Sequence, residues 1–453
     1  MADLRRNRSW FESIRLILFD LTALFFCGMI SSELRGYLVP FVNFTLSDGL
    51  LVMATCLTGL SIIGGYETRR DMCTLRYASE HFLAMGAILL GAFILTYTFT
   101  TYNSSIKPGR SVLFLGLILF APLSLTYRRL LSMKVSREAA NRFIYLIGTR
   151  KLISDVELTC RRAHFRHPLR FIDIESEEGT FKGIREVLSK ELEHCEGVVI
   201  DLSQGKLEPE MQEILLQINL HLVPVYPVEA FIETYFYKVD LSHVNLSWTL
   251  DGTFKADHHS VYGKLKTLID IVFGTSLFLL VLPLMLLTSV LIKLGDFGPV
   301  LFTQVRVGRF ERPFVLYKFR TMSVGTGETE SLYTLKNDRR ITRVGRFLRL
   351  TRIDELPQLW NVVKGDMSII GPRAEWDRLV EIYKKEIPFY HLRYMVKPGI
   401  TGWAQVHYGY GSDIRDTFEK LQYDLYYIKH YSPQMDASII LKTLFTILSA
   451  SGR

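Results

Sequence analysis

The sequence lacks the short patterns that mark common redox, zinc and dinucleotide sites. Its five cysteines are scattered and none forms a C-x-x-C pair, so neither a disulfide framework nor a zinc site is indicated. No segment has the G-x-G-x-x-G spacing of a dinucleotide site. No nucleic-acid-binding motif accompanies the net charge of +8, so we expect no nucleic-acid partner. The basic balance instead suits a protein that lies against anionic lipid.

Charge is missing from several long apolar stretches. They lie at residues 21–32, 49–66, 82–106, 111–127 and 271–292. A helix needs about 20 apolar residues to cross a bilayer. The first four stretches therefore predict a four-helix transmembrane region over residues 1–130, with buried core helices as the alternative. No small-residue cleavage site follows the first stretch, which argues against a cleaved signal peptide.

The distribution of arginine and lysine around these stretches predicts their orientation. Arg5, Arg6 and Arg8 precede the first stretch, and Arg128 and Arg129 follow the fourth, whereas the first loop carries only Arg35. We therefore expect the N-terminus and everything after residue 127 to lie on the cytoplasmic side.

Residues 131–250 have the pattern of a small cytoplasmic α/β domain. Apolar strand-like segments lie at 141–149, 196–203 and 220–227, with helical stretches at 183–194 and 209–220 between them. Alternating strands and helices predict a parallel, Rossmann-like sheet. Gly148 ends the first strand without the glycine spacing of a nucleotide site. We therefore expect this domain to have a structural, oligomerising or regulatory role, and the oligomer would be a homodimer.

The fifth apolar stretch is long enough to span a bilayer, but Pro283 lies in its middle. A proline inside a helix removes a backbone hydrogen bond and bends the helix. Lysines flank both ends, at Lys264, Lys266 and Lys293. A full span would place the following residues outside the cell. We therefore predict a re-entrant helix over about 267–293 that enters the membrane, bends and returns.

Two adjacent carboxylates, Asp354 and Glu355, stand just before Pro357. Proline is favoured in the first helical turn, so residues 356–363 are predicted to form a short helix that starts at the acidic pair. Arg373 adds a planar cation able to bind phosphate oxygens. A carboxylate nucleophile beside a phosphate-binding cation fits phosphoryl transfer. An N-capped helix with surface charge is the alternative for the acidic pair alone.

Longer motifs surround this pair. FTQVRVG begins at residue 302, FVLYKFRTM at 314, KPGITGWAQV at 397 and KLQYDLYYIKHYS at 420. With these motifs in order, residues 258–453 resemble the catalytic domain of the bacterial sugar transferase family, the monotopic phosphoglycosyl transferases. The whole chain resembles the large members of this family and is similar to undecaprenyl-phosphate glucose or galactose phosphotransferases. Its C-terminal sequence most resembles the exopolysaccharide subgroup associated with exosortases.

The resemblance implies a membrane enzyme of the bacterial inner membrane whose catalytic domain faces the cytoplasm. Such enzymes move a sugar 1-phosphate from a UDP-sugar to polyprenyl (undecaprenyl) phosphate, release UMP, and start exopolysaccharide, capsule or O-antigen synthesis. Asp354 matches the family's nucleophile, which forms a covalent phospho-sugar intermediate, and Glu355 matches its partner in metal or proton handling. Asp354 and Glu355 are also the expected ligands of Mg²⁺, which suits oxygen ligands and phosphates.

Five further polar residues are expected to bind substrate. Lys318 and Arg320 alternate with apolar neighbours on a predicted strand, for which an exposed basic strand is the alternative. The resemblance assigns Arg373 to a Pro-Arg-Pro motif, here Pro-Arg-Ala, and the usual Ser-Pro break of the re-entrant helix is here Leu-Pro. The full expected set is Lys318, Arg320, Arg373, Gln304 and Arg306.

Arginine recurs every third residue over 343–352, a pattern that predicts a basic amphipathic helix at a membrane surface. A solvated charged face is the alternative. Trp403, Tyr423, Tyr426 and Tyr427 fit either an interfacial aromatic belt or a protein core.

Two other functions are weighed. A glycosyltransferase that moves the sugar alone is disfavoured because no Asp-X-Asp motif occurs. A catalytically silent membrane scaffold or sensor of polysaccharide assembly is disfavoured because the acidic and basic site residues are all present. The sequence leaves the transferred sugar open.

Overall fold

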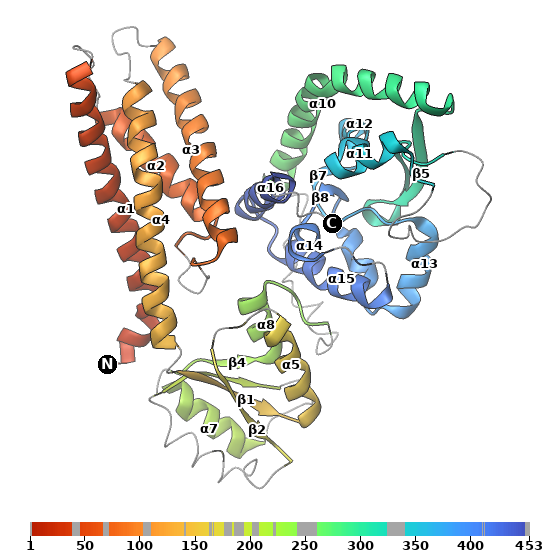
Figure 1. Ribbon diagram of the computed structural model, residues 1–453. Coiled ribbons are helices and arrows are strands. Elements are labelled where there is room, and N and C mark those ends of the chain that lie inside the picture. Colours follow the sequence, from red (N-terminus) through yellow and green to blue (C-terminus); the bar gives the residue numbers. More distant parts are fainter. Residues whose placement is uncertain are drawn as a thin grey trace. The chain divides into compact units, whose positions relative to one another are not determined.

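The computed structural model divides into two compact units, residues Met1–Phe231 and Ile232–Arg453. It describes residues 2–38, 46–66, 72–102, 110–139, 142–162, 165, 167–175, 184, 194–201, 208–220, 223–241, 261–323, 340–409, 411 and 413–448. The predicted helix at 183–194 lies outside these ranges, apart from residues 184 and 194. Figure 1 shows the helices and strands along the chain.

Each of the four N-terminal apolar stretches falls mainly within a helix: α1 (Ala2–Leu38), α2 (Leu46–Ile62), α3 (Leu75–Tyr102) and α4 (Arg110–Ala139). Candidate membrane spans occur at Phe11–Leu34, Tyr77–Ile94 and Phe114–Val135, whereas α2 carries only a shorter apolar part, Val52–Ile62. A further candidate span, Val261–Gly295, lies in the C-terminal unit. The chain is therefore a membrane protein with four helices long and apolar enough to span a bilayer among its described residues.

A buried ion pair joins α1 to α4. Asp20 and Arg128 are both fully buried, and the Arg128 Nη2 donates to Asp20 Oδ2 at 2.6 Å. Ser124 Oγ and Tyr66 OH also donate to the Asp20 carboxylate, at 3.0 and 2.9 Å. Arg128 Nε donates to the Gly65 carbonyl at 3.2 Å. Both charges are thus satisfied by partners, as charges within membrane segments require.

The second part of the first unit is a parallel α/β fold. Its strands are β1 (Phe143–Gly148), β2 (Leu169–Asp173), β3 (Cys195–Ile200) and β4 (Val225–Pro227). They pair in parallel in the order β2-β1-β3-β4. Helices α5 (Arg150–Arg162), α7 (Pro209–Leu220) and α8 (Val228–Phe236) connect or follow the strands.

Strand β1 is buried along its whole length, as expected of a central parallel strand covered on both faces. Phe143, Tyr145 and Ile147 pack with the buried face of α7. The alternate residues Ile144 and Leu146 are also buried, and α5 packs against β1 and β2. The sequence therefore predicted the parallel α/β class, while β2 and α5 gave no signal that we recognised.

The C-terminal unit begins its main fold with one long helix, α10 (Val261–Asp296), which contains Pro283. Figure 1 shows α10 as two arms that meet at a sharp bend. A proline within a helix is the usual cause of such a bend. Apolar side chains project from both arms with high exposure, as for Val272, Leu280 and Leu287. Only 11% of the apolar window is buried, so this helix has a surface suited to lipid.

An antiparallel hairpin follows, β5 (Leu301–Val307) and β6 (Pro313–Phe319), joined through the 3-10 helix η2 (Arg309–Glu311). The chain continues through α11 (Arg343–Thr351), the 3-10 helix η3 (Ile353–Glu355), α12 (Gln358–Lys364) and β7 (Ser368–Ile370). It ends with α13 (Asp377–Glu386), the 3-10 helix η4 (Tyr390–Met395), β8 (Gly399–Thr401), α14 (Trp403–His407), α15 (Ile414–Lys429) and α16 (Pro433–Leu448). Strands β7 and β8 pair in parallel.

The aromatic residues of the C-terminal motifs form the core of this unit. Trp403 is 5% exposed and Tyr427 1% exposed, and Tyr423 and Tyr426 pack against the same cluster. The core alternative therefore holds for these residues, and the interfacial belt does not. Residues 232–241 also belong to this unit, because Val239 and Leu241 are buried in the same cluster.

Candidate active site

The acidic pair lies in a tight turn between two helices. Arg352 ends α11 in the left-handed conformation, with φ 60°, and the chain then enters η3, which carries Asp354 and Glu355. Helix α12 follows from Gln358, with Pro357 as its N-cap at φ −61°. The predicted short helix is confirmed, but it starts after the acidic pair, which occupies its own 3-10 turn.

Glu355 is the point where two predicted cations meet. Lys318 Nζ donates to Glu355 Oε1 at 2.9 Å, and Arg373 Nη2 donates to the same oxygen at 3.0 Å. Burial opposes ionisation of Glu355, but Arg373 and Lys318 overcome that effect and hold its pKa far below the usual range. Burial lowers the pKa of Lys318 although Glu355 favours its charge. Glu355 is thus a fixed negative charge that holds both cations.

Asp354 has the opposite electrostatic character. Burial raises its pKa, and the neighbouring charge of Glu355 raises it further, against the lowering effects of Lys318, Arg349 and Arg352. Its Oδ1 atom is buried and has no hydrogen-bond partner among the described residues. A partly desolvated carboxylate oxygen without a donor is suited to act as a nucleophile or a metal ligand.

The hairpin brings Lys318 to this turn. Residues that pair across antiparallel strands share one face, and Phe302 pairs with Lys318, Gln304 with Leu316, and Arg306 with Phe314. Lys318, Gln304 and Arg306 therefore share one face of the hairpin, as the alternating pattern predicted.

Asn361 of α12 fixes the position of β6. Its Nδ2 donates to the Val315 carbonyl at 2.7 Å, and its Oδ1 accepts from the Tyr317 amide at 3.2 Å. Asn361 is fully buried. Since Lys318 follows Tyr317 directly, these hydrogen bonds fix the position of Lys318 relative to the acidic pair. Sequence reasoning missed Asn361, because a lone asparagine in an apolar helix gives no signal of a contact 46 residues away.

Two of the other predicted residues have partners of their own. Arg306 Nη1 donates to the Ala374 carbonyl at 3.1 Å and lies 3.8 Å from the Glu375 carboxylate, which places it beside the Arg373 segment. Arg320 is 8% exposed, and its guanidinium lies directly against Gly298, where a side chain would collide with it. The Arg320 guanidinium thus lies against the segment that follows α10.

The residues present fit a divalent cation in part. No cluster of three or more His, Cys, Asp or Glu side chains with metal-ligand proximity occurs in the described residues. Mg²⁺ is commonly held by one or two carboxylates together with substrate phosphates and water. The unpartnered Asp354 Oδ1 meets that requirement, with Glu355 beside it.

Helix α11 presents both charge and apolar surface outward. Leu348 is buried, whereas Phe347 and Leu350 are 59% and 66% exposed. Arg343 and Arg346 are exposed as well. Thr342 caps the helix by accepting a bond from the Gly345 amide at 2.8 Å. The predicted basic amphipathic helix is therefore present, directly before the turn that carries Asp354.

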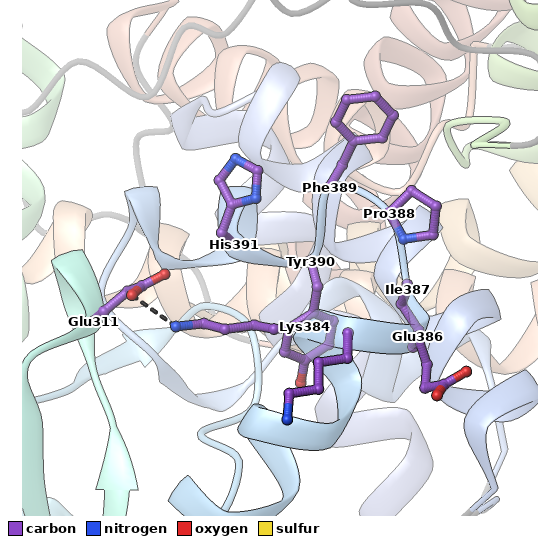
Figure 2. Close-up of a pocket in the computed structure, with 9 residues that line it drawn as sticks. Glu311, Lys384, Glu386, Ile387, Pro388, Phe389, Tyr390 and His391 are labelled. Carbon is purple, nitrogen blue, oxygen red and sulfur yellow. Dashed lines mark hydrogen bonds and ion pairs between the residues drawn. The ribbon is translucent and has the colours of Figure 1, made fainter.

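A pocket of about 320 Å³ lies apart from these residues (Figure 2). Glu311 and Lys384 line it and form an ion pair at 2.7 Å. Pro388, between α13 and η4, and His391, in η4, line it as well. No predicted site residue lines this pocket, so it is not the site of the acidic pair.

Comparisons with known proteins agree with the motifs of this site. The model of the family described as bacterial sugar transferase matches residues 261–450. The chain is 42% identical to the UDP-N-acetylgalactosamine-undecaprenyl-phosphate N-acetylgalactosaminephosphotransferase of Aeromonas hydrophila, over 57% of this chain and 60% of that protein. It is 42% identical to the UDP-glucose:undecaprenyl-phosphate glucose-1-phosphate transferase of Klebsiella pneumoniae, over 40% of this chain and 39% of that protein.

A shorter relative is matched almost throughout. The exopolysaccharide production protein PSS of Rhizobium leguminosarum bv. phaseoli is 39% identical over 41% of this chain and 96% of that protein. The matches thus cover less than two thirds of the two enzymes named above and nearly all of this shorter protein. The matched part holds the acidic pair, Lys318 and Arg373, and the chain belongs to the bacterial sugar transferase family.

Proposed function

We propose that this chain transfers a sugar 1-phosphate from a UDP-sugar to undecaprenyl phosphate. The observation that carries the proposal is the shared contact of Lys318 and Arg373 with one oxygen of Glu355, beside the unpartnered carboxylate oxygen of Asp354. Both substrates are anionic, so transfer requires cations that neutralise phosphate charge. The relatives' names, which state undecaprenyl-phosphate transferase activity, support the same reaction.

The residues suggest a two-step reaction. The Asp354 carboxylate attacks the phosphorus that bears the sugar, an Asp–O–P bond forms, and the bond from that phosphorus to the UMP oxygen breaks. A phosphate oxygen of the polyprenyl acceptor then attacks the same phosphorus, which releases Asp354 and forms the diphosphate-linked sugar. Arg373 and Lys318, already held at Glu355, bind the phosphate oxygens through both steps. Bound Mg²⁺ at Asp354 and Glu355 would neutralise further phosphate charge.

The site also has to meet a lipid substrate. We infer that α10 is a re-entrant helix, because it bends around its central proline and exposes apolar side chains along both arms (Figure 1). Phe347 and Leu350 of α11 would rest in the same membrane surface, with Arg343 and Arg346 near lipid phosphates. In this proposal Asp354 lies at the cytoplasmic face of the inner membrane.

The first unit has a supporting role in this proposal. Its parallel strand order β2-β1-β3-β4 supports a doubly wound, Rossmann-like domain, because one common doubly wound order begins 2-1-3-4. The G-x-G-x-x-G fingerprint is missing after β1. We therefore assign it assembly or regulation, including formation of a homodimer, and not catalysis.

The nucleotide product tests the proposal. Purified protein in nanodiscs is incubated with undecaprenyl phosphate, Mg²⁺ and, in separate reactions, UDP-glucose, UDP-galactose or UDP-N-acetylgalactosamine. Release of UMP together with a lipid-linked diphosphate sugar is expected for one of them. Release of UDP would instead show transfer of the sugar alone and would overturn the proposed reaction.

A further inference from the structure

The main-chain segment that carries Arg373 is held at four successive carbonyl groups. Each carbonyl of residues 372–375 accepts a hydrogen bond from a donor far away in the sequence. Two donors are main-chain amides, one directly after Pro398 and one in the hairpin, and two are arginine side chains, one in the hairpin and one in η4. The donors, in the order of the carbonyls, are Gly399 N (2.8 Å), Arg393 Nη2 (3.0 Å), Arg306 Nη1 (3.1 Å) and Val307 N (3.2 Å).

Arg393 has the most elaborate surroundings of these donors. It is 5% exposed and lies in η4. Its Nη2 also donates to Asp424 Oδ2 at 2.9 Å, and its Nη1 donates to Tyr390 OH at 2.5 Å. Asp424, on α15, is 2% exposed. The guanidinium therefore joins α15 and η4 to the carbonyl of Arg373.

An arginine is an unusual choice for a position this deeply buried. A buried ion pair often contributes no more stability than apolar residues of similar size, because both charges lose their hydration. A lysine could balance Asp424 as a point charge, but it lacks the planar fork that holds several acceptors in fixed directions. The side chain present is thus the one that satisfies Asp424 and the Arg373 carbonyl together.

We propose that Arg393 is a positioning residue of the transferase site, which fixes the backbone of Arg373 so that its guanidinium faces Glu355 and the substrate phosphates. This inference rests on the proposed function. The role has a local reason, since Ala374 stands where the family motif has a second proline. The backbone after Arg373 lacks that ring, and the hydrogen bonds to the carbonyls of residues 372–375 restrain it.

The first test uses the full-length protein with Arg393→Lys. The lysine keeps a positive charge beside Asp424 but loses the fork. We expect kcat for UMP release to fall by roughly 10- to 100-fold, because small misplacement of a charge-stabilising group lowers the rate by such factors. The KM for the UDP-sugar should change much less, and the melting temperature should stay near that of the unaltered protein.

A second variant removes the buried charges without leaving either one unpaired. The double change Arg393→Met with Asp424→Leu should keep the fold and show the same loss of kcat. Its matched control is Lys238→Met with Glu419→Leu, which replaces another ion pair of this unit, with atoms 2.9 Å apart. That control should change kcat by less than about twofold, as expected for a change away from the site.

A double-mutant cycle separates positioning from a general effect on the fold. In an Arg373→Gln background the guanidinium to be positioned is gone, so adding Arg393→Lys should change kcat by less than about twofold. An equal loss in both backgrounds, or a wild-type kcat for Arg393→Lys alone, would overturn the positioning role. If the unaltered protein releases no UMP from any UDP-sugar, the proposed function itself fails and takes this inference with it.

Discussion

Asp354 and Glu355 are neighbours in one 3-10 turn, yet the pKa values of their carboxyl groups are shifted in opposite directions. Burial and the charge of Glu355 raise the pKa of Asp354. Burial acts on Glu355 too, but Arg373 and Lys318 contact it directly and lower its pKa far below its usual range. Opposed environments of this kind assign different roles to paired carboxylates. Glu355 organises the cations, and Asp354 is left as the more basic, reactive group.

The pH dependence of the reaction should report the state of Asp354. A nucleophilic carboxylate must be ionised, so activity is lost as pH falls through its pKa. Arg349 lowers that pKa, and its removal should raise it. We expect Arg349→Gln to move the acidic limb of the kcat profile to higher pH, while Arg343→Gln on the same helix leaves it in place. A shift to lower pH, or equal shifts in both variants, would contradict this electrostatic role.

The membrane path of α10 makes a topological prediction. In a variant whose native cysteines are replaced by serine, Lys264→Cys and Lys293→Cys should both react with an impermeant thiol reagent from the cytoplasmic side. A re-entrant helix returns to the face it left, whereas a spanning helix does not. Labelling of the two positions from opposite sides would refute the re-entrant path. Pro283→Ala should favour a straight helix and shift labelling at position 293.

The ion pair between α1 and α4 predicts that loss of one charge lowers the stability strongly, whereas loss of both charges lowers it much less. Asp20→Leu leaves the fully buried Arg128 without its counter-charge, and loss of one partner of such a pair costs about 3–5 kcal/mol. Thermal unfolding in detergent should show a large decrease for Asp20→Leu. The double change with Arg128→Met should recover most of it, since no charge remains unpaired. Equal losses in the single and double variants would show that the pair itself, and not its imbalance, is what matters.

The boundary of the catalytic unit can be tested by truncation. Trp403 Nε1 donates to the Tyr237 carbonyl at 2.9 Å, and the Val239 amide donates to the Gln422 carbonyl at 3.0 Å. Burial of a side chain such as Val239 or Leu241 contributes about 1.5–3 kcal/mol. A chain that begins at residue 232 should therefore unfold at a higher temperature than one that begins at residue 257. Equal unfolding temperatures would show that residues 232–241 do not support this fold.

Part of the site was predictable because its signals are local. Pro357 marks a helix start, and alternation along 314–320 marks a strand with one polar face. The acidic pair, Lys318 and the short helix could therefore be predicted from a few neighbouring residues. The sequence predicted that Lys318, Arg373 and Glu355 belong to one site, but it did not predict that both cations contact Glu355. The geometry of this site depends on contacts 37 and 18 residues apart in sequence.

The supporting residues were not predictable for the same reason. Asn361 and Arg393 act through hydrogen bonds to backbone groups 46 and 20 residues away in sequence, and neither belongs to a pattern that periodicity detects. Trp403 shows the opposite problem, because an aromatic residue in a membrane protein suits an interface and a core equally until its neighbours are known. Its indole is buried and donates a hydrogen bond to the Tyr237 carbonyl, so Trp403 belongs to the core.

The central claim is that Asp354 forms a covalent bond to the phosphorus that bears the sugar. The most direct measurement is intact-protein and peptide mass spectrometry after incubation with the UDP-sugar and Mg²⁺, without lipid acceptor. We expect a phospho-sugar adduct on Asp354, stoichiometric UMP, and loss of both in Asp354→Asn, whose turnover should fall by roughly three or more orders of magnitude. Glu381→Gln, an exposed carboxylate on α13, should retain the adduct. Full turnover by Asp354→Asn, or an adduct on another residue, would contradict the account.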